Sequence, residues 1–129
     1  MDLLLDTHVL VWWLANSARL GQPARAAIAE PANRVHVSAV SAWEIAIKVG
    51  LGKMPVLPNV AFWLPAELQR NRFAAMPITL EHAAGVEHLP RHHGDPFDRL
   101  LIAQAVTEGL TIVTADPAFV RYGIPLIRC

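Results

Sequence analysis

Four acidic side chains occupy positions in this sequence that suit metal chemistry. Asp6, Asp98 and Asp116 each follow an expected strand or begin an expected helix, and Glu44 lies in the apolar helical segment SAWEIAIK. In an open parallel sheet, the ends of the strands converge on one edge, where ligands bind. Carboxylates brought together in this way repel each other, so they must take up protons or bind a cation.

The ion that fits such a cluster follows from the ligand type. The segments around the acids offer no dedicated Lys or Arg counter-ion for all of them. Hard oxygen ligands select Mg²⁺ or Mn²⁺ rather than zinc. Such an ion holds a phosphodiester, activates a water molecule and stabilises the leaving oxygen, without a protein nucleophile. The acids therefore predict metal-dependent phosphodiester hydrolysis.

Each acid, taken singly, also has a structural explanation. Asp6, Asp95 and Asp116 are suited to capping helix N-termini. Asp98 lies near the third position of its helix, where the helix dipole favours a negative charge. Glu44 precedes Lys48 by four residues, the favoured order for a helical ion pair. The conjunction of the acids at one edge favours the metal site, but for Asp95 the helix cap remains the preferred interpretation.

The elements that must position these acids alternate along the chain. Expected strands cover residues 3–5, 34–38, 73–78, 110–114 and 124–127. Expected helices cover residues 8–15, 22–30, 60–72, 79–88 and 95–107, with a short one after Asp116 and another that starts at Ser38 or Ser41 and runs to about residue 49. Pro65 is awkward inside the 60–72 segment, and we expect it in the first turn of a shorter helix.

This alternation predicts an α/β fold. Helices of about a dozen residues between strands imply right-handed crossovers and a parallel sheet covered on both faces. We therefore expect a three-layer α/β/α sandwich with a central parallel sheet. The chain has 129 residues and no linker or repeat, so we expect one domain over residues 1–129.

Composition narrows the class of protein. With 53% hydrophobic residues the chain can bury a substantial core, which excludes a disordered protein. The net charge of zero gives no bulk sign of nucleic-acid binding. The single cysteine, Cys129, cannot form an internal disulfide, the apolar start is interrupted by Asp6 and His8, and no apolar run is long enough to cross a bilayer. We expect a soluble cytoplasmic protein that does not associate with membranes.

Four segments, in this order, resemble a known family. They are LLLDTHVLVWWL, VSAVSAWEIAIKVGLGKM, HHGDPFDRLLIAQA and LTIVTADPAFVRYGIPLI. Together they span nearly the whole chain and are similar to the PIN-domain ribonucleases, especially the VapC toxins of bacterial type II toxin–antitoxin pairs. The resemblance implies a compact α/β/α domain that cleaves RNA with Mg²⁺. Pro65 departs from the usual pattern in the middle of the family's sequences, which affects packing and not the acids.

The resemblance assigns roles to individual residues of this chain. The four metal-binding and catalytic acids are Asp6, Glu44, Asp98 and Asp116. Asp95 caps its helix or orients a water molecule. Thr114 hydrogen-bonds a metal ligand or water, and Thr7 is a weaker candidate for the same role.

The resemblance also implies partners. VapC proteins usually form homodimers, and a VapB antitoxin inhibits them, commonly by placing an Arg or Lys among the acids. Arg91 and Arg99 are candidates for RNA phosphate contacts. For His92 and His93 a solvated loop is the preferred interpretation. For Trp12, Trp13, Trp43 and Trp63 core packing or a dimer face is preferred over base stacking.

Other function classes fit less well. A catalytically weak PIN-fold module that binds RNA or protein is the alternative, but all four family acids are present. A phosphatase of the haloacid type would have a second Asp two residues after Asp6, where this chain has His8. A receiver domain would have a Lys late in the sheet, but both lysines occur by residue 53. Specificity for transfer, ribosomal or messenger RNA stays open at this stage, as do the number of metal ions, the identity of the antitoxin and the dimer geometry.

Overall fold

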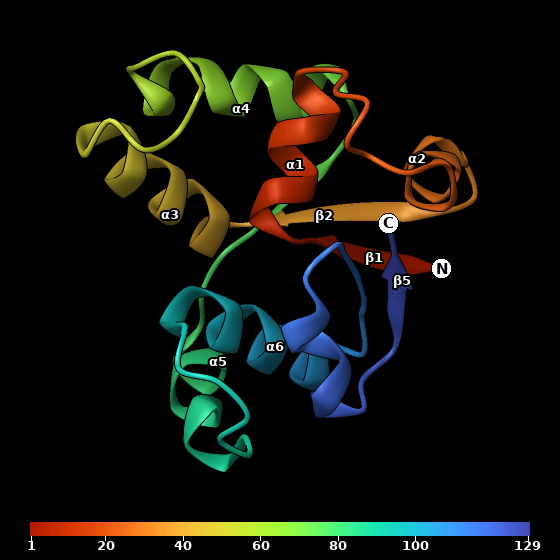
Figure 1. Ribbon diagram of the computed structural model, residues 1–129, viewed down its shortest axis with the longest axis vertical. Helices are drawn as coiled ribbons and strands as arrows, with labels where there is room; N and C mark the ends of the chain where they lie inside the picture. Colours follow the sequence, from red (N-terminus) through yellow and green to blue (C-terminus); the bar gives the residue numbers. More distant parts are fainter.

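The computed structural model describes all residues, 1–129, and is built on a five-stranded parallel sheet (Figure 1). The strands are β1 (Asp2–Leu5), β2 (Arg34–Ser38), β3 (Ala74–Met76), β4 (Thr111–Thr114) and β5 (Leu126–Arg128), in the spatial order β3-β2-β1-β4-β5. Both neighbours of the central strand β1 pair with it in parallel, as do the two outer pairs. The predicted parallel sheet is confirmed.

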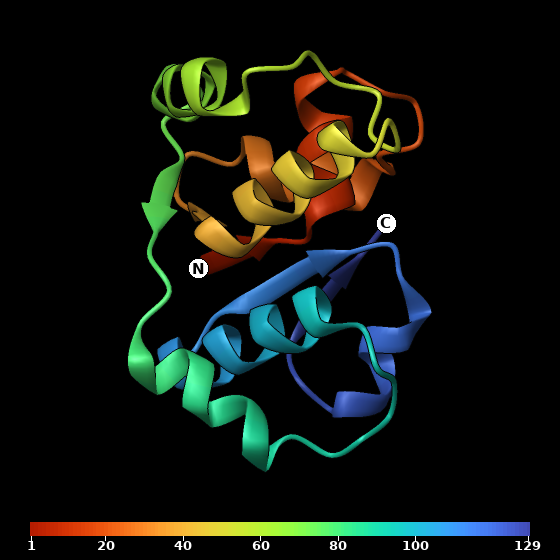
Figure 2. The ribbon, with the colours of Figure 1, turned by 90° about the vertical axis from the view of Figure 1, so that its left-hand side faces the viewer.

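Helices cover both faces of this sheet. On one face lie α1 (Thr7–Leu14), α2 (Gln22–Ala29), α3 (Ala39–Gly50) and α4 (Val60–Arg70), and on the other lie α5 (Leu80–Gly85) and α6 (Pro96–Glu108) with two 3₁₀ helices, η1 (Val86–His88) and η2 (Pro117–Tyr122). Figures 1 and 2 show the two helical layers with the sheet between them. The three-layer α/β/α sandwich is therefore confirmed.

The alternation of side chains along β1 explains why the core has two parts. Leu3 and Leu5 belong to the cluster under α1 to α4, whereas Leu4 belongs to the cluster under α6, and all three are fully buried. Successive side chains of a strand point to opposite faces of its sheet. A continuous apolar run is thus what a central strand covered on both faces requires.

Two predicted elements differ from the structure. The 79–88 segment contains a short helix, α5, followed by the 3₁₀ helix η1. Pro65 lies inside the full-length helix α4, five residues after the helix begins at Val60, so the expected shorter helix is wrong. Pro65 cannot donate to the carbonyl one turn earlier, but burial of Val60, Leu64 and Leu68 along one stripe holds α4 on the core.

The start of α3 is fixed by a buried polar contact across the layers. The Ser38 hydroxyl accepts a hydrogen bond from the Val40 amide, which makes Ser38 the N-cap, and donates one to Oε1 of Gln104 on α6. The Gln104 amide in turn donates to the carbonyl of Pro77. This network ties α3 and α6, which carry Glu44 and Asp98, to the edge where β2 ends.

We expect Ser38→Ala to lower the free energy of unfolding by about 2 kcal/mol, because the variant loses a helix cap and leaves a buried amide oxygen without a donor. Urea unfolding of the metal-free protein measures this. Ser17→Ala is the matched control, since that hydroxyl accepts only from the exposed Arg19 amide, and should change stability by less than about 0.5 kcal/mol. Equal effects of the two variants would contradict the importance of the cap.

None of the helices combines the length and the hydropathy that a membrane-spanning segment needs.

Candidate active site

Asp6 lies directly after β1 and is buried. It stands at the N-cap position of α1, yet its side chain makes no capping hydrogen bond. Instead its Oδ2 accepts a hydrogen bond of 2.8 Å from the hydroxyl of Thr114, at the end of the neighbouring strand β4. The structure therefore gives Asp6 no local structural role that would explain a buried carboxylate.

Thr114 connects two of the acids. Its hydroxyl donates to Asp6 and accepts a hydrogen bond of 3.0 Å from the backbone amide of Asp116. The Asp116 carboxylate accepts from the Ala118 amide and so begins η2. The hydroxyl of Thr7, the other threonine predicted to support the site, donates to Ser41 and ties α1 to α3.

Asp98 and Asp95 share the start of α6 but have different surroundings. The Asp95 carboxylate accepts a hydrogen bond of 3.0 Å from the Asp98 amide, which makes Asp95 the helix cap. Asp98 is buried, and its Oδ2 lies 3.2 Å from Nε2 of His93. The capping interpretation of Asp95 agrees with this geometry.

Glu44 is buried on α3, where one of its oxygens has a partner and the other has none. Oε2 accepts a hydrogen bond from Lys48, one turn further along the helix, and this bond raises the pKa of the Lys48 ammonium. Oε1 is a buried polar atom without any hydrogen-bond partner. A buried carboxylate oxygen without a partner destabilises the fold unless a bound ligand interacts with it.

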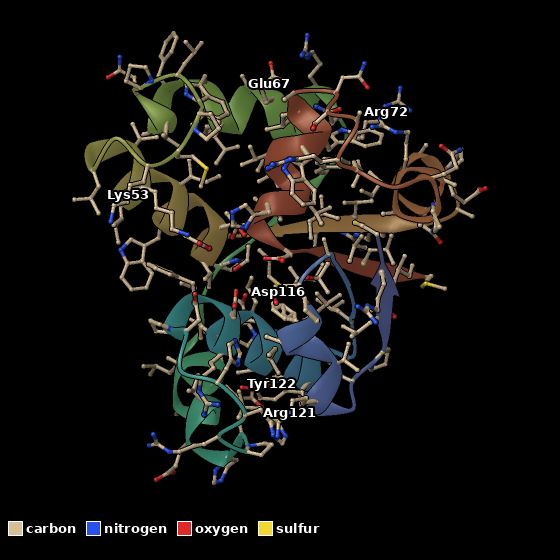
Figure 3. The ribbon with its side chains drawn as sticks, in the orientation of Figure 1. Lys53, Glu67, Arg72, Asp116, Arg121 and Tyr122 are labelled. Carbon is tan, nitrogen blue, oxygen red and sulfur yellow. The ribbon has the colours of Figure 1, made fainter.

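The acids converge closely enough to influence one another. Desolvation by burial, together with the negative charges of Asp6, Asp95, Asp116 and Glu44, raises the pKa of Asp98 to about 8. Burial also raises the pKa of Asp6, and the negative charge of Glu44 adds to this increase. Figure 3 shows Asp116 between the two helical layers. Carboxyl groups from both layers of the fold thus meet at the edge where β1 and β4 end.

Comparison with known proteins decides what kind of domain carries this site. A family model described as "PIN domain" matches residues 3–125. The chain belongs to the PIN-domain family. It is 37% identical over 114 residues to Ribonuclease VapC22 of Mycobacterium tuberculosis, across 88% of this chain and 85% of that protein. This identity and coverage place it among the VapC-type members of the family.

Solved structures share the same fold. A VapBC2 complex of Rickettsia felis bound to a promoter DNA fragment matches with a TM-score of 0.74 at 17% identity, over 100% of this chain and 99% of that one. A DNA-bound VapBC complex of Salmonella typhimurium gives the same score and identity, over 99% and 98% of the two chains. The α/β/α architecture of this PIN domain is thus that of its solved neighbours.

The residues of this PIN domain fit a hard divalent cation. No three Asp, Glu, His or Cys side chains form a ready-made ligand set, but Mg²⁺ keeps several waters and binds proteins through one or two carboxylates. The donors at this edge are carboxylate oxygens, and one of them, Oε1 of Glu44, is buried without a partner. A cation would also relieve the repulsion that holds a proton on Asp98.

Some predicted residues have other contacts in the structure. The Arg99 guanidinium donates to the carbonyl of Pro90 and to the Tyr122 hydroxyl, whereas Arg91 is exposed. Trp12, Trp13 and Trp63 pack against the core, and Trp43 is half exposed beside Phe97.

Sequence reasoning missed two residues of the site. Lys48 pairs with Glu44, as the spacing predicts, but the charges of Asp95 and Asp98 also raise the pKa of its ammonium group. His93 was interpreted as part of a solvated loop, yet its ring lies beside Asp98. The spacing of five residues between His93 and Asp98 was the available signal for the second contact, and it is too common to stand out.

Proposed function

We propose that this PIN domain, residues 1–129, is a Mg²⁺-dependent endoribonuclease that acts as the toxin of a bacterial toxin–antitoxin pair. The observation that carries the proposal is the convergence of buried carboxylates from both layers, which together with burial raises the pKa of Asp98 to about 8. The 37% identity to a ribonuclease supports RNA as the substrate. Mn²⁺ offers the same hard-ligand chemistry and should substitute.

Within this proposal each residue has a defined task. Asp6, Glu44, Asp98 and Asp116 hold the ion, which when bound activates a water molecule and stabilises the leaving oxygen of the phosphodiester. Thr114 holds Oδ2 of Asp6, so that the orientation of this carboxylate is set before the ion arrives.

Two cationic residues contribute to substrate binding in the proposal. Lys48 donates a hydrogen bond to Glu44, and with a cation bound by the carboxylates the Lys48 ammonium would be available to contact a phosphate of the RNA. Arg91 lies exposed on the loop before α6 and is proposed to contact the RNA backbone.

The proposed partners are a VapB-type antitoxin and a second copy of the chain. The solved neighbours include VapBC complexes, and the acids of this site suit an Arg or Lys from an inhibitor. Trp43, half exposed, is available for a protein interface. The place of action proposed for the toxin is the cytoplasm.

The decisive experiment is cleavage of a labelled panel of transfer, ribosomal and messenger RNA by the purified chain. We expect cleavage with Mg²⁺, loss to background with EDTA, and recovery when excess Mg²⁺ is restored, because the carboxylates hold the ion that activates water. Asp6→Asn should remain at background. Asp2→Asn is its matched control, since Asp2 lies on the same strand but is exposed, and should cleave like the wild type.

Two outcomes would contradict the proposal. The first is cleavage that survives both EDTA and Asp6→Asn. The second is the absence of cleavage of every RNA class by folded protein that is free of antitoxin, which would favour a PIN-fold binding module.

A further inference from the structure

A directed chain of hydrogen bonds ends on Asp98. Nη1 of Arg99 lies 3.0 Å from the Tyr122 hydroxyl, that hydroxyl lies 2.7 Å from Nδ1 of His93, and Nε2 of the same ring lies 3.2 Å from Oδ2 of Asp98. These four residues come from the loop before α6, from α6 itself and from the end of η2. Figure 3 shows Tyr122 away from Asp116, on the side of η2 far from the upper helical layer.

The first residue sets the direction of the whole chain. A guanidinium carries only donors, so Arg99 must donate to the Tyr122 oxygen. The single phenolic proton finds a partner in this chain only if it is donated to the other neighbour, Nδ1 of His93. A neutral imidazole that accepts at Nδ1 carries its proton on Nε2. The group that faces Asp98 is therefore an N–H donor.

The origin of the chain is itself held in place. Arg99 also donates to the Pro90 carbonyl at 2.8 Å and lies 3.4 Å and 3.5 Å from the carbonyls of Leu89 and Val86. Its guanidinium is thereby fixed against the loop that carries His93. The imidazole is also enclosed by aromatic rings, with Tyr122 at 5.4 Å and Phe119 at 6.4 Å between ring centroids.

We propose that His93 is a positioning residue for Asp98, and that Tyr122 and Arg99 select its Nε2–H tautomer. The N–H donates to Oδ2 of Asp98 and would leave Oδ1 available to bind a cation. Because Tyr122 closes η2 and Asp116 begins it, the same chain fixes the distance between two acid-bearing segments. Hydrogen bonds of this kind around metal ligands orient them and tune their affinity. The inference rests on the proposed metal-dependent activity.

The tautomer can be observed directly. In wild-type protein, nitrogen-15 NMR of the imidazole should show His93 with a protonated Nε2 and an unprotonated Nδ1. In Tyr122→Phe, which keeps the ring and removes the hydroxyl, the two tautomers should mix. A purely structural role of Tyr122 would leave the His93 nitrogen shifts unchanged, and that result would overturn the inference.

Metal affinity supplies the second readout, with Mn²⁺ as the probe in calorimetry. We expect the Mn²⁺ Kd to weaken about tenfold in Tyr122→Phe and about 10- to 100-fold in His93→Leu. His93→Gln, which retains an N–H at a similar reach, should recover part of the loss. His92→Phe is the matched control, because His92 only packs edge-on against Tyr122, and it should bind Mn²⁺ like the wild type.

The two proposals fail in different ways. Wild-type protein that neither binds Mn²⁺ nor cleaves RNA would overturn the proposed function, and the inference with it. Wild-type protein that does both, together with His93→Leu and Tyr122→Phe variants of unchanged Mn²⁺ affinity, would overturn the inference alone. Adding Tyr122→Phe to His93→Leu should cause no further loss, because the hydroxyl acts only through the imidazole.

Discussion

Replacing Asp98 with asparagine is expected to abolish RNA cleavage and to stabilise the metal-free protein in the same step. Loss of one charged ligand removes several kcal/mol of transition-state stabilisation, and about 4 kcal/mol corresponds to a rate loss of about 10³-fold. Asparagine has nearly the same shape but no charge to bury. The repulsion from Asp6, Asp95, Asp116 and Glu44 that now acts on Asp98 would disappear.

The gain in stability is expected to be modest. Solvent reaches part of the Asp98 side chain and screens its interactions. We therefore expect Asp98→Asn to raise the free energy of unfolding by about 1 kcal/mol. For a domain of this size, that corresponds to a rise in Tm of about 3 °C. Thermal unfolding in EDTA at pH 8 measures the gain, and initial rates of RNA cleavage with Mg²⁺ measure the loss.

Glu108→Gln is the matched control for this pair of effects. Glu108 is the last residue of the same helix, and its side chain is 43% exposed and lies 3.4 Å from His82. Because glutamine keeps a polar group at that position, Glu108→Gln should change neither the rate of RNA cleavage nor the Tm appreciably. An Asp98→Asn protein that cleaves RNA at a rate near that of the wild type would remove Asp98 from the active site. An Asp98→Asn protein that loses activity and stability together would show that Asp98 supports the fold rather than the chemistry.

The sequence predicted the fold and the position of most of the acids because both depend on local patterns. The apolar run at residues 3–5 predicted a buried strand, because a strand covered on both faces needs such a run, and the structure shows β1 as the buried central strand. The positions of Asp6 and Asp116 after strands predicted that they would meet at one edge. Both inferences use local spacing and the general geometry of parallel sheets.

Other features depend on contacts between distant residues, which no local pattern records. Asp6 was equally suited to capping α1, and only the hydroxyl of Thr114, 108 residues away, distinguishes the two roles. Pro65 was expected to restrict its helix, but burial of Leu64 and Leu68 outweighs the lost hydrogen bond. The contact of His93 with Tyr122 spans 29 residues and joins the loop before α6 to the end of η2, which propensity cannot place together.

Metal affinity should depend steeply on pH, because the ion must displace a proton. With the pKa of Asp98 raised to about 8 in the metal-free fold, each pH unit below that value costs about a factor of ten in apparent affinity. Since Asp98 is already half protonated at pH 8, the Mg²⁺ Kd should weaken about 50-fold from pH 8 to pH 6 and level off above pH 8. Burial raises the pKa of Asp6 as well, so this carboxyl should also weaken metal affinity as the pH falls.

The stability of the metal-free fold should depend on pH in the direction opposite to that of metal affinity. A carboxyl whose pKa is higher in the folded state than its usual 3.8 binds more protons when folded, so it stabilises the metal-free fold below pH 4 and this contribution is lost as the pH rises toward 8. Calorimetry with Mg²⁺ at pH 6, 7 and 8, and urea unfolding in EDTA at the same values, measure the two slopes. Asp98→Asn should flatten both, whereas a wild-type Kd that does not change between pH 6 and 8 would mean that Asp98 is already ionised and that the ion meets no competing proton.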